Sequence, residues 1–457
     1  MKLSTIQHTL TELGVRPTKS LGQNFLHDQN LARWIVAQLE LSPAEHFVEI
    51  GPGLGALTEY ALPLCASATL IDKDARLVAF LREEFAGDRV GIVHGDAAQF
   101  DVRTLFPHGP VKVLGNLPYY ISSQILFRFA DEPSPASRLV FTLQRELAER
   151  LVAKPATKEF GIITLIIGRR WRVKLLRTLP ASVFIPAPKV ESSVILLTRR
   201  EPGELPECDG DFFNALVKRG FSQRRKQLRK MLADFLTQAA SPADWPSLAK
   251  QIGVTETARA EELGLEQWIA LTNLLRPSDD TPAQRVHDEI FDVVDADDRV
   301  TGTATRHEVH TRQLNHRAVH VFVFNRGGEL FLQKRSRWKD MHPSKWDSSA
   351  AGHVESGRGY DETAAREIVE ELGVAATVGW IGKIPVSERT GHEFVHVYRA
   401  RHDGPFRLAP SEIESGCFFP VPLVARWIAS RPHDFAPGFL ECWKMFPDCQ
   451  HQPPLVP

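Results

Sequence analysis

The sequence predicts an α/β protein with an open, mostly parallel sheet, a small helical domain and then a second α/β/α domain. Short apolar runs alternate with helix-like segments up to about residue 200. Residues 211–275 contain no strand-like run, and such runs return after residue 285. Alternation of strands and helices is typical of a parallel sheet with crossover helices. A chain of 457 residues has room for two or three such domains.

The strands of the first sheet are expected at five short apolar runs, with helices at 57–64 and 75–85 between them. Two later runs, 173–179 and 193–198, are expected to be antiparallel strands. The five earlier runs are 47–51, 68–72, 91–94, 112–114 and 139–143.

The second half follows a polar segment with two prolines, residues 276–283, which predicts a linker. Strands are expected at 291–294, 318–324 and 329–333, and the turn Asn325-Arg-Gly-Gly predicts that the last two form a hairpin. Residues 361–372 are expected to form a helix ended by Gly373. The expected boundaries are 1–205 and 206–275 for the first two domains, 276–285 for the linker and 286–457 for the last domain.

Composition indicates a cytoplasmic protein with no membrane partner. The longest apolar run, 160–167, is far shorter than the roughly 18 residues of a membrane helix, and the first ten residues lack a signal-peptide pattern. The five cysteines are scattered without metal-type spacing, which predicts reduced thiols.

The charge is unevenly distributed, although the net charge is only −1. Residues 145–230 contain 19 Lys and Arg against 9 Asp and Glu. Such a stretch in a nearly neutral protein is typical of a face that binds a polyanion, although solvated helices also carry charge runs. The densest cluster is Lys218-Arg219, Arg224-Arg225-Lys226 and Arg229-Lys230.

A glycine-rich loop, Gly51-Pro-Gly53-Leu-Gly55, follows the first predicted strand. Glycines there let a nucleotide-like ligand approach the backbone at the carboxyl edge of the sheet. Asp72 ends the second strand and can bind a ribose hydroxyl pair. Asp96 follows the third strand, where it can hold an adenine amine. The loop by itself also fits an NAD site or a simple tight turn.

The segment Asn116-Leu117-Pro118-Tyr119 favours methyl transfer to the amino group of a base. A purine amine is a poor nucleophile until its two N–H groups are held by acceptors that draw the nitrogen toward tetrahedral geometry. Asn116 can supply one acceptor and the carbonyl of Leu117 or Pro118 the other. Tyr119 offers a ring face to a base that has left its stack.

From about residue 16 to 275 the chain resembles the bacterial 16S ribosomal-RNA adenine dimethyltransferase family. The resemblance implies a Rossmann-like domain that binds S-adenosylmethionine and a helical RNA-binding domain. It also implies N6,N6-dimethylation of two adjacent adenosines near the 3′ end of 16S rRNA in the small ribosomal subunit. The segments that carry the resemblance are Lys19–Leu26, Glu49–Gly55, Asn116–Tyr119, Phe184–Ser192 and Phe221–Arg229.

The same resemblance implies roles for individual residues. Asn116, Leu117, Pro118, Tyr119 and Phe184 are implied to be catalytic, with Phe184 facing Tyr119 across the target base. The implied cofactor site comprises Gln23, Asn24, Leu26, Gly51, Gly53, Asp72, Asp96 and Asn116. Contacts to RNA phosphates are implied for Lys218, Arg219, Arg224, Arg225, Lys226 and Arg229.

Two relatives leave alternatives open. The 23S rRNA methyltransferases that confer macrolide resistance share the loop and the Asn-Pro-Tyr turn, but they usually lack a stretch like Phe221–Arg229. Mitochondrial members of the family act as transcription factors, which leaves a non-catalytic RNA-binding module as a second alternative. The intact motifs favour the enzyme.

A second set of motifs indicates chemistry on a diphosphate. Glu367, Glu370 and Glu371 stand at i, i+3 and i+4 of the predicted helix, so their carboxylates share one face and repel unless a cation binds them. Mg²⁺ there would bridge substrate phosphates and help to create a hydroxide nucleophile. Glutamate pairs are also common on solvated helices.

The segment Gly352–Val374 resembles the Nudix hydrolase box, through Gly352, Arg366, Glu367, Ile368, Glu370, Glu371, Gly373 and Val374. The resemblance implies an α/β/α Nudix domain, a small-molecule diphosphate substrate, Mg²⁺ on the three glutamates and a catalytic role for Glu367. Arg358 stands where the family has its first box glutamate. A cation cannot support the metal there, and Glu355 or Glu362 are the candidates to substitute for it.

Segments around His316, Gln333 and Trp346 resemble the Nudix branch nearest isopentenyl-diphosphate isomerase. This implies His316 and His353 as metal ligands and Glu412 or Glu414 as a later carboxylate. The catalytic cysteine of that enzyme falls near Ala350 or Ala351. We therefore expect hydrolysis of a nucleoside-diphosphate-type substrate, ahead of binding without catalysis and of isomerisation.

Overall fold

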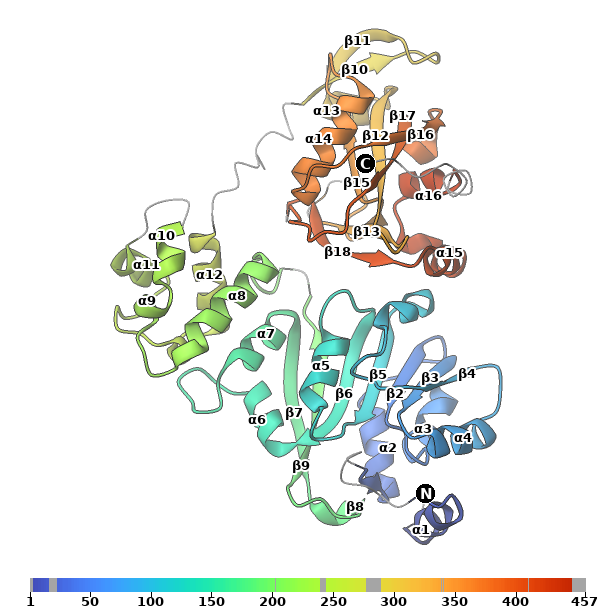
Figure 1. Ribbon diagram of the computed structural model, residues 1–457, viewed down its shortest axis with the longest axis vertical. Helices are drawn as coiled ribbons and strands as arrows, with labels where there is room; N and C mark the ends of the chain where they lie inside the picture. Colours follow the sequence, from blue (N-terminus) through green and yellow to red (C-terminus); the bar gives the residue numbers. More distant parts are fainter. Residues whose placement is uncertain are drawn as a thin grey trace. The chain divides into compact units, whose positions relative to one another are not determined.

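The computed structural model describes residues 3–15, 23–201, 203–238, 244–276, 289–337, 339, 341–409 and 411–445. The chain divides into two compact units, Met1–Ser278 and Asp279–Pro457, both drawn in Figure 1. Part of the Lys19–Leu26 segment and most of the expected linker lie outside the described residues. Within the described residues, no helix is long and apolar enough to cross a membrane.

The first unit is built on a seven-stranded sheet. Its members along the chain are β2 (His46–Ile50), β3 (Ser67–Asp72), β4 (Val90–His94), β5 (Val111–Asn116), β6 (Ala136–Gln144), β7 (Trp171–Leu179) and β9 (Ser192–Arg199). The order in space is β4-β3-β2-β5-β6-β9-β7. Strands β2 to β6 are parallel, and β9 is antiparallel to both of its neighbours. All seven predicted strands are confirmed. The order reverses at β2, which opens a crevice at the carboxyl ends of β2, β3 and β5.

Helices cover both faces of this sheet because alternate strand residues point to opposite sides. Phe47 belongs to one apolar core and Val48 to the other. The expected helix 57–64 is a short α-helix followed by a 3-10 helix, Leu62–Leu64, which contains Pro63. One face carries α2 (Gln29–Ala37), α3 (Thr58–Ala61) and α4 (Ala75–Glu84), and the other carries α5 (Ser122–Ala130), α6 (Arg145–Leu151) and α7 (Ile162–Arg170).

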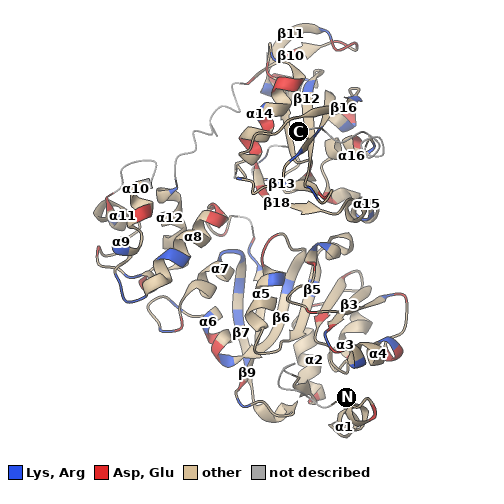
Figure 2. Ribbon diagram, in the orientation of Figure 1, with Lys and Arg blue, Asp and Glu red and all other residues tan. Residues whose placement is uncertain are grey.

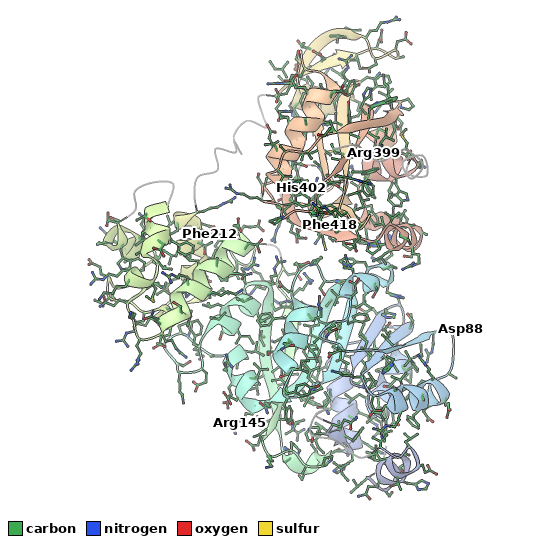
Figure 3. All side chains as sticks on the ribbon, in the orientation of Figure 1. Asp88, Arg145, Phe212, Arg399, His402 and Phe418 are labelled. Carbon is green, nitrogen blue, oxygen red and sulfur yellow. The ribbon has the colours of Figure 1, made fainter. Side chains whose placement is uncertain are left out.

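The described part of 211–275 is helical, as predicted. Asp209 accepts the N–H groups of Asp211 and Phe212 and so begins the first of these helices. Phe212 (Figure 3) packs edge-on against Phe235, and Trp268 lies in the centre of the helical core. The helices are α8 (Gly210–Gly220), α9 (Leu228–Met231), α10 (Ala233–Gln238), α11 (Trp245–Gln251) and α12 (Leu265–Leu275).

The second unit contains a sheet that divides in its middle. Its strands are β12 (His316–Phe324), β13 (Leu330–Arg335), β14 (Trp346–Asp347), β15 (Ala350–His353), β16 (Gly379–Ile384), β17 (Glu393–Arg401) and β18 (Ile413–Phe419). β12 pairs along its length with β17 and through four residues with β15, whereas β13 pairs with β14 and β18. The hairpin expected from the Asn325 turn is formed at one pair only, Phe324 with Leu330. Beyond that pair the two strands diverge.

The helix expected at 361–372 is confirmed as α14 (Tyr360–Leu372). It ends at Gly373, whose φ of 68° is the left-handed conformation that favours glycine. Ala364, Ile368 and Leu372 pack in one core with Val319 and Val321 of β12. The remaining elements of this unit are β10 (Ile290–Val294), β11 (Val300–Thr305), α13 (Arg306–Thr311), α15 (Val421–Ser430) and α16 (Pro437–Trp443).

Candidate active sites of the two units

The glycine loop after β2 borders a cleft at the carboxyl edge of the first sheet. Gly51, Gly53 and Gly55 all have positive φ, between 60° and 80°, which glycine adopts without strain. A Cβ on Gly53 would lie 3.0 Å from the Phe25 ring. A side chain at this position would therefore press against that ring. The loop and the ends of β3 and β5 together line this cleft, which also includes Tyr120 and Ile125.

Two carboxylates line this cleft at the ends of β3 and β4. Asp72 accepts the N–H groups of Gly53 at 3.3 Å and Asp74 at 2.9 Å, and burial raises its pKa to about 6. Asp96 pairs with Lys73 at 2.8 Å, which lowers its pKa. All eight residues that the sequence assigned to the cofactor site line the cleft: Gln23, Asn24, Leu26, Gly51, Gly53, Asp72, Asp96 and Asn116.

Asn116 ends β5 at the border of the cleft. Its amide nitrogen donates to the backbone carbonyl of Asn24 at 2.7 Å. The amide nitrogen is therefore engaged inside the protein, and the side-chain oxygen is left to act as an acceptor. Leu117 is buried behind the turn, and the carbonyl of Pro118 accepts the N–H of Ile121 at 3.2 Å.

The aromatic rings near this turn differ in their exposure. The Tyr119 hydroxyl contacts the Ser192 hydroxyl at 2.5 Å, and Phe184 is only 4 % exposed in a core that includes Leu26. Neither ring lines the cleft, whereas Tyr120 does and is 56 % exposed. The sequence analysis did not single out Tyr120. Its place directly after the Asn116–Tyr119 segment was the available signal.

Glu49 is a second residue that sequence reasoning left without a role. It ends β2 beneath the glycine loop, lines the cleft, and accepts the Thr58 hydroxyl at 2.6 Å. Burial raises its pKa to about 8, so the protonated form is favoured in the folded protein at neutral pH. A buried acid one residue from the loop is the sequence feature that could have indicated it.

The basic cluster of the helical domain contains two kinds of side chain. Arg224 donates to Glu261 at 2.6 Å and to the carbonyls of Thr157 and Lys158, so it ties the helical domain to a loop of the sheet domain. The others are exposed; Arg219 pairs with Asp234 and Arg229 donates to Gln227. The exposed members are Lys218, Arg219, Arg225, Lys226, Arg229 and Lys230.

In the second unit, α14 places its three glutamates beside a cavity at the division of the sheet. Glu367 and Glu371 are buried, and burial raises both pKa values, with added repulsion from Glu371 on Glu367 and from Asp347 on Glu371; Glu370 is exposed. Gly352 is required for this arrangement, because a Cβ there would lie 2.2 Å from the Glu367 carboxyl carbon. Arg366 contacts Glu367 at 2.9 Å and Glu370 at 3.6 Å.

Arg358 lies at the start of the box, where it contacts Glu355 at 3.0 Å and also pairs with Glu362. Glu355 is shared with Arg366, at 2.7 Å. The two carboxylates that could substitute for the missing box glutamate are therefore both paired with cations in this conformation.

A group of imidazoles lies along the same cavity. Ligand atoms of His310, His316 and His353 all lie within 4.8 Å of one another. The Glu393 carboxylate lies 3.1 Å from Nε2 of His353 and 3.5 Å from Nε2 of His316. The carboxylate beside these imidazoles is Glu393 rather than Glu412 or Glu414, because β12 and β17 pair His316 with Glu393 in register.

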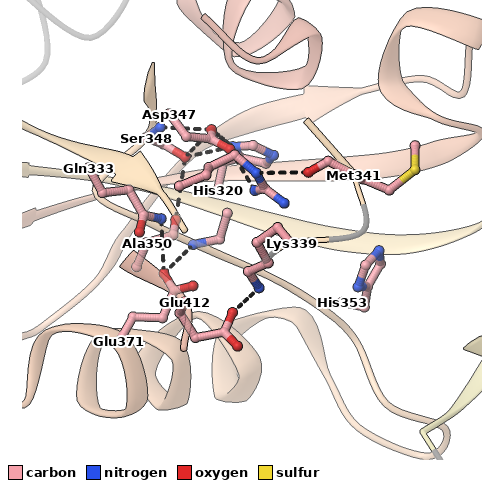
Figure 4. A network of polar contacts seen from close by, with 12 residues as sticks. His320, Gln333, Lys339, Met341, Asp347, Ser348, Ala350, His353, Glu371 and Glu412 are labelled. Atoms are coloured by element: carbon pink, nitrogen blue, oxygen red, sulfur yellow. Dashed lines mark hydrogen bonds and ion pairs between the residues drawn. The ribbon is translucent and has the colours of Figure 1, made fainter. Parts of the chain in front are cut away.

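Glu412 and Glu414 serve other contacts, with Lys339 and Lys334 respectively. Figure 4 shows Lys339 and Glu412 between the imidazole and carboxylate groups, with Gln333 donating to Glu371 at 3.1 Å. Coulombic attraction from Lys339 works against the raised pKa of Glu371. Arg306, Arg335 and Arg389 add further positive charge to the cavity lining.

The strand order and the glycine-loop cleft define the first unit as a Rossmann-like methyltransferase fold. Residues 15–276 match the family described as ribosomal RNA adenine dimethylase, and residues 314–438 match the NUDIX domain. The chain belongs to the ribosomal RNA adenine dimethylase family and carries a Nudix domain after it.

Two relatives named ribosomal RNA small subunit methyltransferase A agree with this assignment by sequence. The ribosomal RNA small subunit methyltransferase A of Prosthecochloris aestuarii is 40% identical over 50% of this chain and 86% of its own length. Its namesake from Porphyromonas gingivalis is 39% identical over 57% of this chain and 98% of its own length. The structure of a dimethyladenosine transferase from Plasmodium falciparum is similar over 54% of this chain and 95% of its own, at 22% identity and a TM-score of 0.47.

Proposed function

We propose that the first unit transfers methyl groups from S-adenosylmethionine to the N6 atoms of two adjacent adenosines near the 3′ end of 16S rRNA, in the small ribosomal subunit and in the cytoplasm. Asp72 and Asp96 suit a ribose hydroxyl pair and an adenine amine, and the open glycine loop suits close approach of a nucleoside. When bound, the cofactor supplies a methyl group on a positively charged sulfur.

The contact between Asn116 and Asn24 carries this proposal. With its nitrogen held by the Asn24 carbonyl, the Asn116 side chain presents Oδ1 to one N–H of the target amine. We assign the second acceptor to the Leu117 carbonyl; the Pro118 carbonyl accepts the Ile121 N–H, keeps one lone pair and is the alternative. The amine nitrogen then points its lone pair at the methyl group. Tyr120, open at the mouth of the cleft, supplies the ring face for the base.

The test uses the full chain, S-adenosylmethionine and small ribosomal subunits that lack the modification. Mass spectrometry of the RNA should show two dimethyladenosines in 16S rRNA. Modification of 23S rRNA would instead assign the resistance-type reaction. RNA binding without methyl transfer would make the unit a binding module.

For the second unit we propose hydrolysis of a nucleoside-diphosphate-type substrate with Mg²⁺ held by Glu367, Glu370 and Glu371. Carboxylate oxygens suit Mg²⁺, and a bound cation would offset the repulsion between carboxylates that share one face of α14. Glu367, directly against the backbone at Gly352, is the proposed catalytic carboxylate. Arg335 and Lys339 are placed to bind the phosphates.

We also propose that His310, His316, His353 and Glu393 hold a separate transition-metal ion, since imidazole nitrogens suit such metals better than Mg²⁺. Metal analysis after purification in Mn²⁺ or Zn²⁺ should show bound metal that His316→Ala loses and Glu370→Gln retains. Hydrolysis of a diphosphate panel with Mg²⁺ tests the activity. Isomerisation of an allylic diphosphate, or binding without turnover, would assign the alternatives.

A further inference from the structure

The edge strand of the first sheet carries a row of cations that no role described above uses. Arg172, Lys174 and Arg177 of β7 are all exposed, and Figure 2 shows Lys and Arg bands along this strand. β7 and its neighbour β9 contain four arginine or lysine residues and no acidic residue. Among the described residues β7 pairs with β9 alone, so its outer edge is open in that part of the chain.

The strand register places these three side chains on one face. Arg172, Lys174 and Arg177 pair across to Thr198, Leu196 and Val194, with a register shift between Leu175 and Arg177 that keeps Arg177 in line. Alternate residues of β9 point to the same side of the sheet. The three residues are hereafter the β7 cation row.

Two members of the row are available for an external anion. Arg172 pairs with Glu204. Within the described residues, no acidic side chain is paired with Lys174 or Arg177. The Arg177 guanidinium lies over the ring of Trp34 on α2, 5.8 Å from the centroid. Stacking on an aromatic face holds an arginine in place while leaving its N–H groups free to donate.

β7 runs from the helical domain at one end to the cleft edge of the sheet at the other. β7 and β6 are both antiparallel to β9, so β7 ends at the same sheet edge as the cleft. There Leu179 pairs with Ser192, whose hydroxyl contacts Tyr119. At its other end β7 follows α7, which shares the helical domain's core through Leu165. The strand covers roughly 23 Å between these ends.

We propose that the β7 cation row binds rRNA phosphates and holds the RNA along the sheet edge, between the exposed basic side chains of the helical domain and the methyl-transfer cleft. This inference rests on the proposed rRNA substrate. Charged residues on edge strands also serve to prevent strand-to-strand aggregation. That role needs neither a single sign of charge nor an arginine seated on a tryptophan.

The test compares Lys174→Gln/Arg177→Gln with Arg82→Gln in the full chain. Arg82 is exposed on α4, the helix that packs against the opposite edge strand, β4. Two probes are used: a 16-base-pair RNA duplex at several salt concentrations, and unmodified small ribosomal subunits. The double variant should bind the duplex about tenfold more weakly, and its salt slope should fall by roughly 1–2. Its KM for subunits should rise similarly with kcat within twofold, while Arg82→Gln leaves these values unchanged.

Charge-retaining Lys174→Arg/Arg177→Lys should keep the salt slope, which separates charge loss from misfolding. Unchanged affinity, salt slope and KM in the double glutamine variant would overturn the inference. Aggregation of that variant with unchanged RNA affinity would also overturn it and assign the row to edge protection. If the unaltered chain methylates no subunits, the proposed function fails, but loss of duplex binding in the double variant still supports the row.

Discussion

The side-chain nitrogen of Asn116 and the backbone oxygen of Asn24 lie 2.7 Å apart, although 92 positions separate the two residues. Asn24 precedes β1 (Phe25–Leu26), which pairs with β8 (Phe184–Ile185). The amide that we propose to accept the target amine is therefore oriented by backbone from the start of the domain. Changes in that early segment can affect catalysis without touching Asn116.

Asn116→Ala should remove one acceptor for the amine and cost about 2–4 kcal/mol of transition-state stabilisation, the range for loss of an electrostatic catalytic contact. Methylation kinetics should show this as a fall in kcat. Cofactor affinity, measured separately by calorimetry, should weaken less, because the other cleft residues remain. Undiminished turnover would show that Asn116 does not hold the amine.

Glu49 should make the stability of the first unit depend on pH. Its pKa is about 8 in the folded state against an ordinary value of 4.5, so between these values the folded protein retains a proton that the unfolded chain releases. The resulting stabilisation is complete below pH 4.5 and is lost as pH rises toward 8, by up to about 1.4 kcal/mol per pH unit. Urea unfolding at pH 6, 7 and 8 should show the decline.

Glu49→Gln should flatten that profile, because glutamine resembles the protonated acid and cannot ionise. The exposed Glu83→Gln is the matched control and should keep the unaltered slope. Equal slopes in all three proteins would contradict a buried, protonated Glu49.

Arg224 and Arg225 are adjacent but should respond differently to alanine. Arg224→Ala removes contacts to Glu261 and to two loop carbonyls, so we expect a loss of thermal stability. Arg225→Ala should leave stability unchanged, weaken RNA binding and reduce its salt slope. Calorimetry and filter binding on both variants distinguish these effects. Weaker RNA binding without a loss of thermal stability in Arg224→Ala would show that Arg224 contacts RNA instead of holding the two domains together.

The sequence predicted the strands and the position of the cleft-lining residues, because Gly51, Asp72 and Asn116 each stand at or directly after the carboxyl end of a strand of one parallel sheet. The parallel arrangement alone brings such positions to one edge. The sequence could not predict which aromatic ring is exposed in the cleft, because the burial of Phe184 depends on packing with Leu26. Glu393 was not predicted for a similar reason. It lies beside His316 only because β12 pairs with β17, and the two residues are 77 positions apart in the sequence.

Arg358→Glu should restore a carboxylate at the start of the Nudix box and release Glu362 from its cation, while Glu355 keeps its pair with Arg366. We expect tighter Mg²⁺ binding by titration and faster diphosphate cleavage, and loss of both in Glu370→Gln. The competing role for Arg358 is to bind a substrate phosphate through its guanidinium. A large rise in KM without a gain in Mg²⁺ affinity would establish that role instead.

Gly352→Ala should displace the Glu367 carboxylate, since the added Cβ would lie 2.2 Å from its carboxyl carbon. Mg²⁺ affinity should fall while metal bound at the imidazole group is retained, which elemental analysis of the purified protein can measure. The matched control is Gly359→Ala, because a Cβ added at Gly359 has no neighbour within 4 Å. Gly357→Ala is unsuitable because the φ of Gly357 is positive. Equal Mg²⁺ affinity in both variants would argue against Glu367 as a ligand.

Besides the single pair between Phe324 and Leu330 and the Asn325–Gly328 turn beside it, two groups of strands are joined through the Ser349 hydroxyl, which accepts the Val323 N–H of β12 and donates to the Phe331 carbonyl of β13. One group bears the imidazoles and the other bears Gln333, Arg335 and Asp347. A short turn and one bridging hydroxyl, rather than a ladder of backbone hydrogen bonds, therefore hold the two groups together. Natural variation in the length or composition of that turn could therefore alter which diphosphates fit, while the apolar cores on either side stay intact. Substrate range in such a domain can diverge faster than its fold.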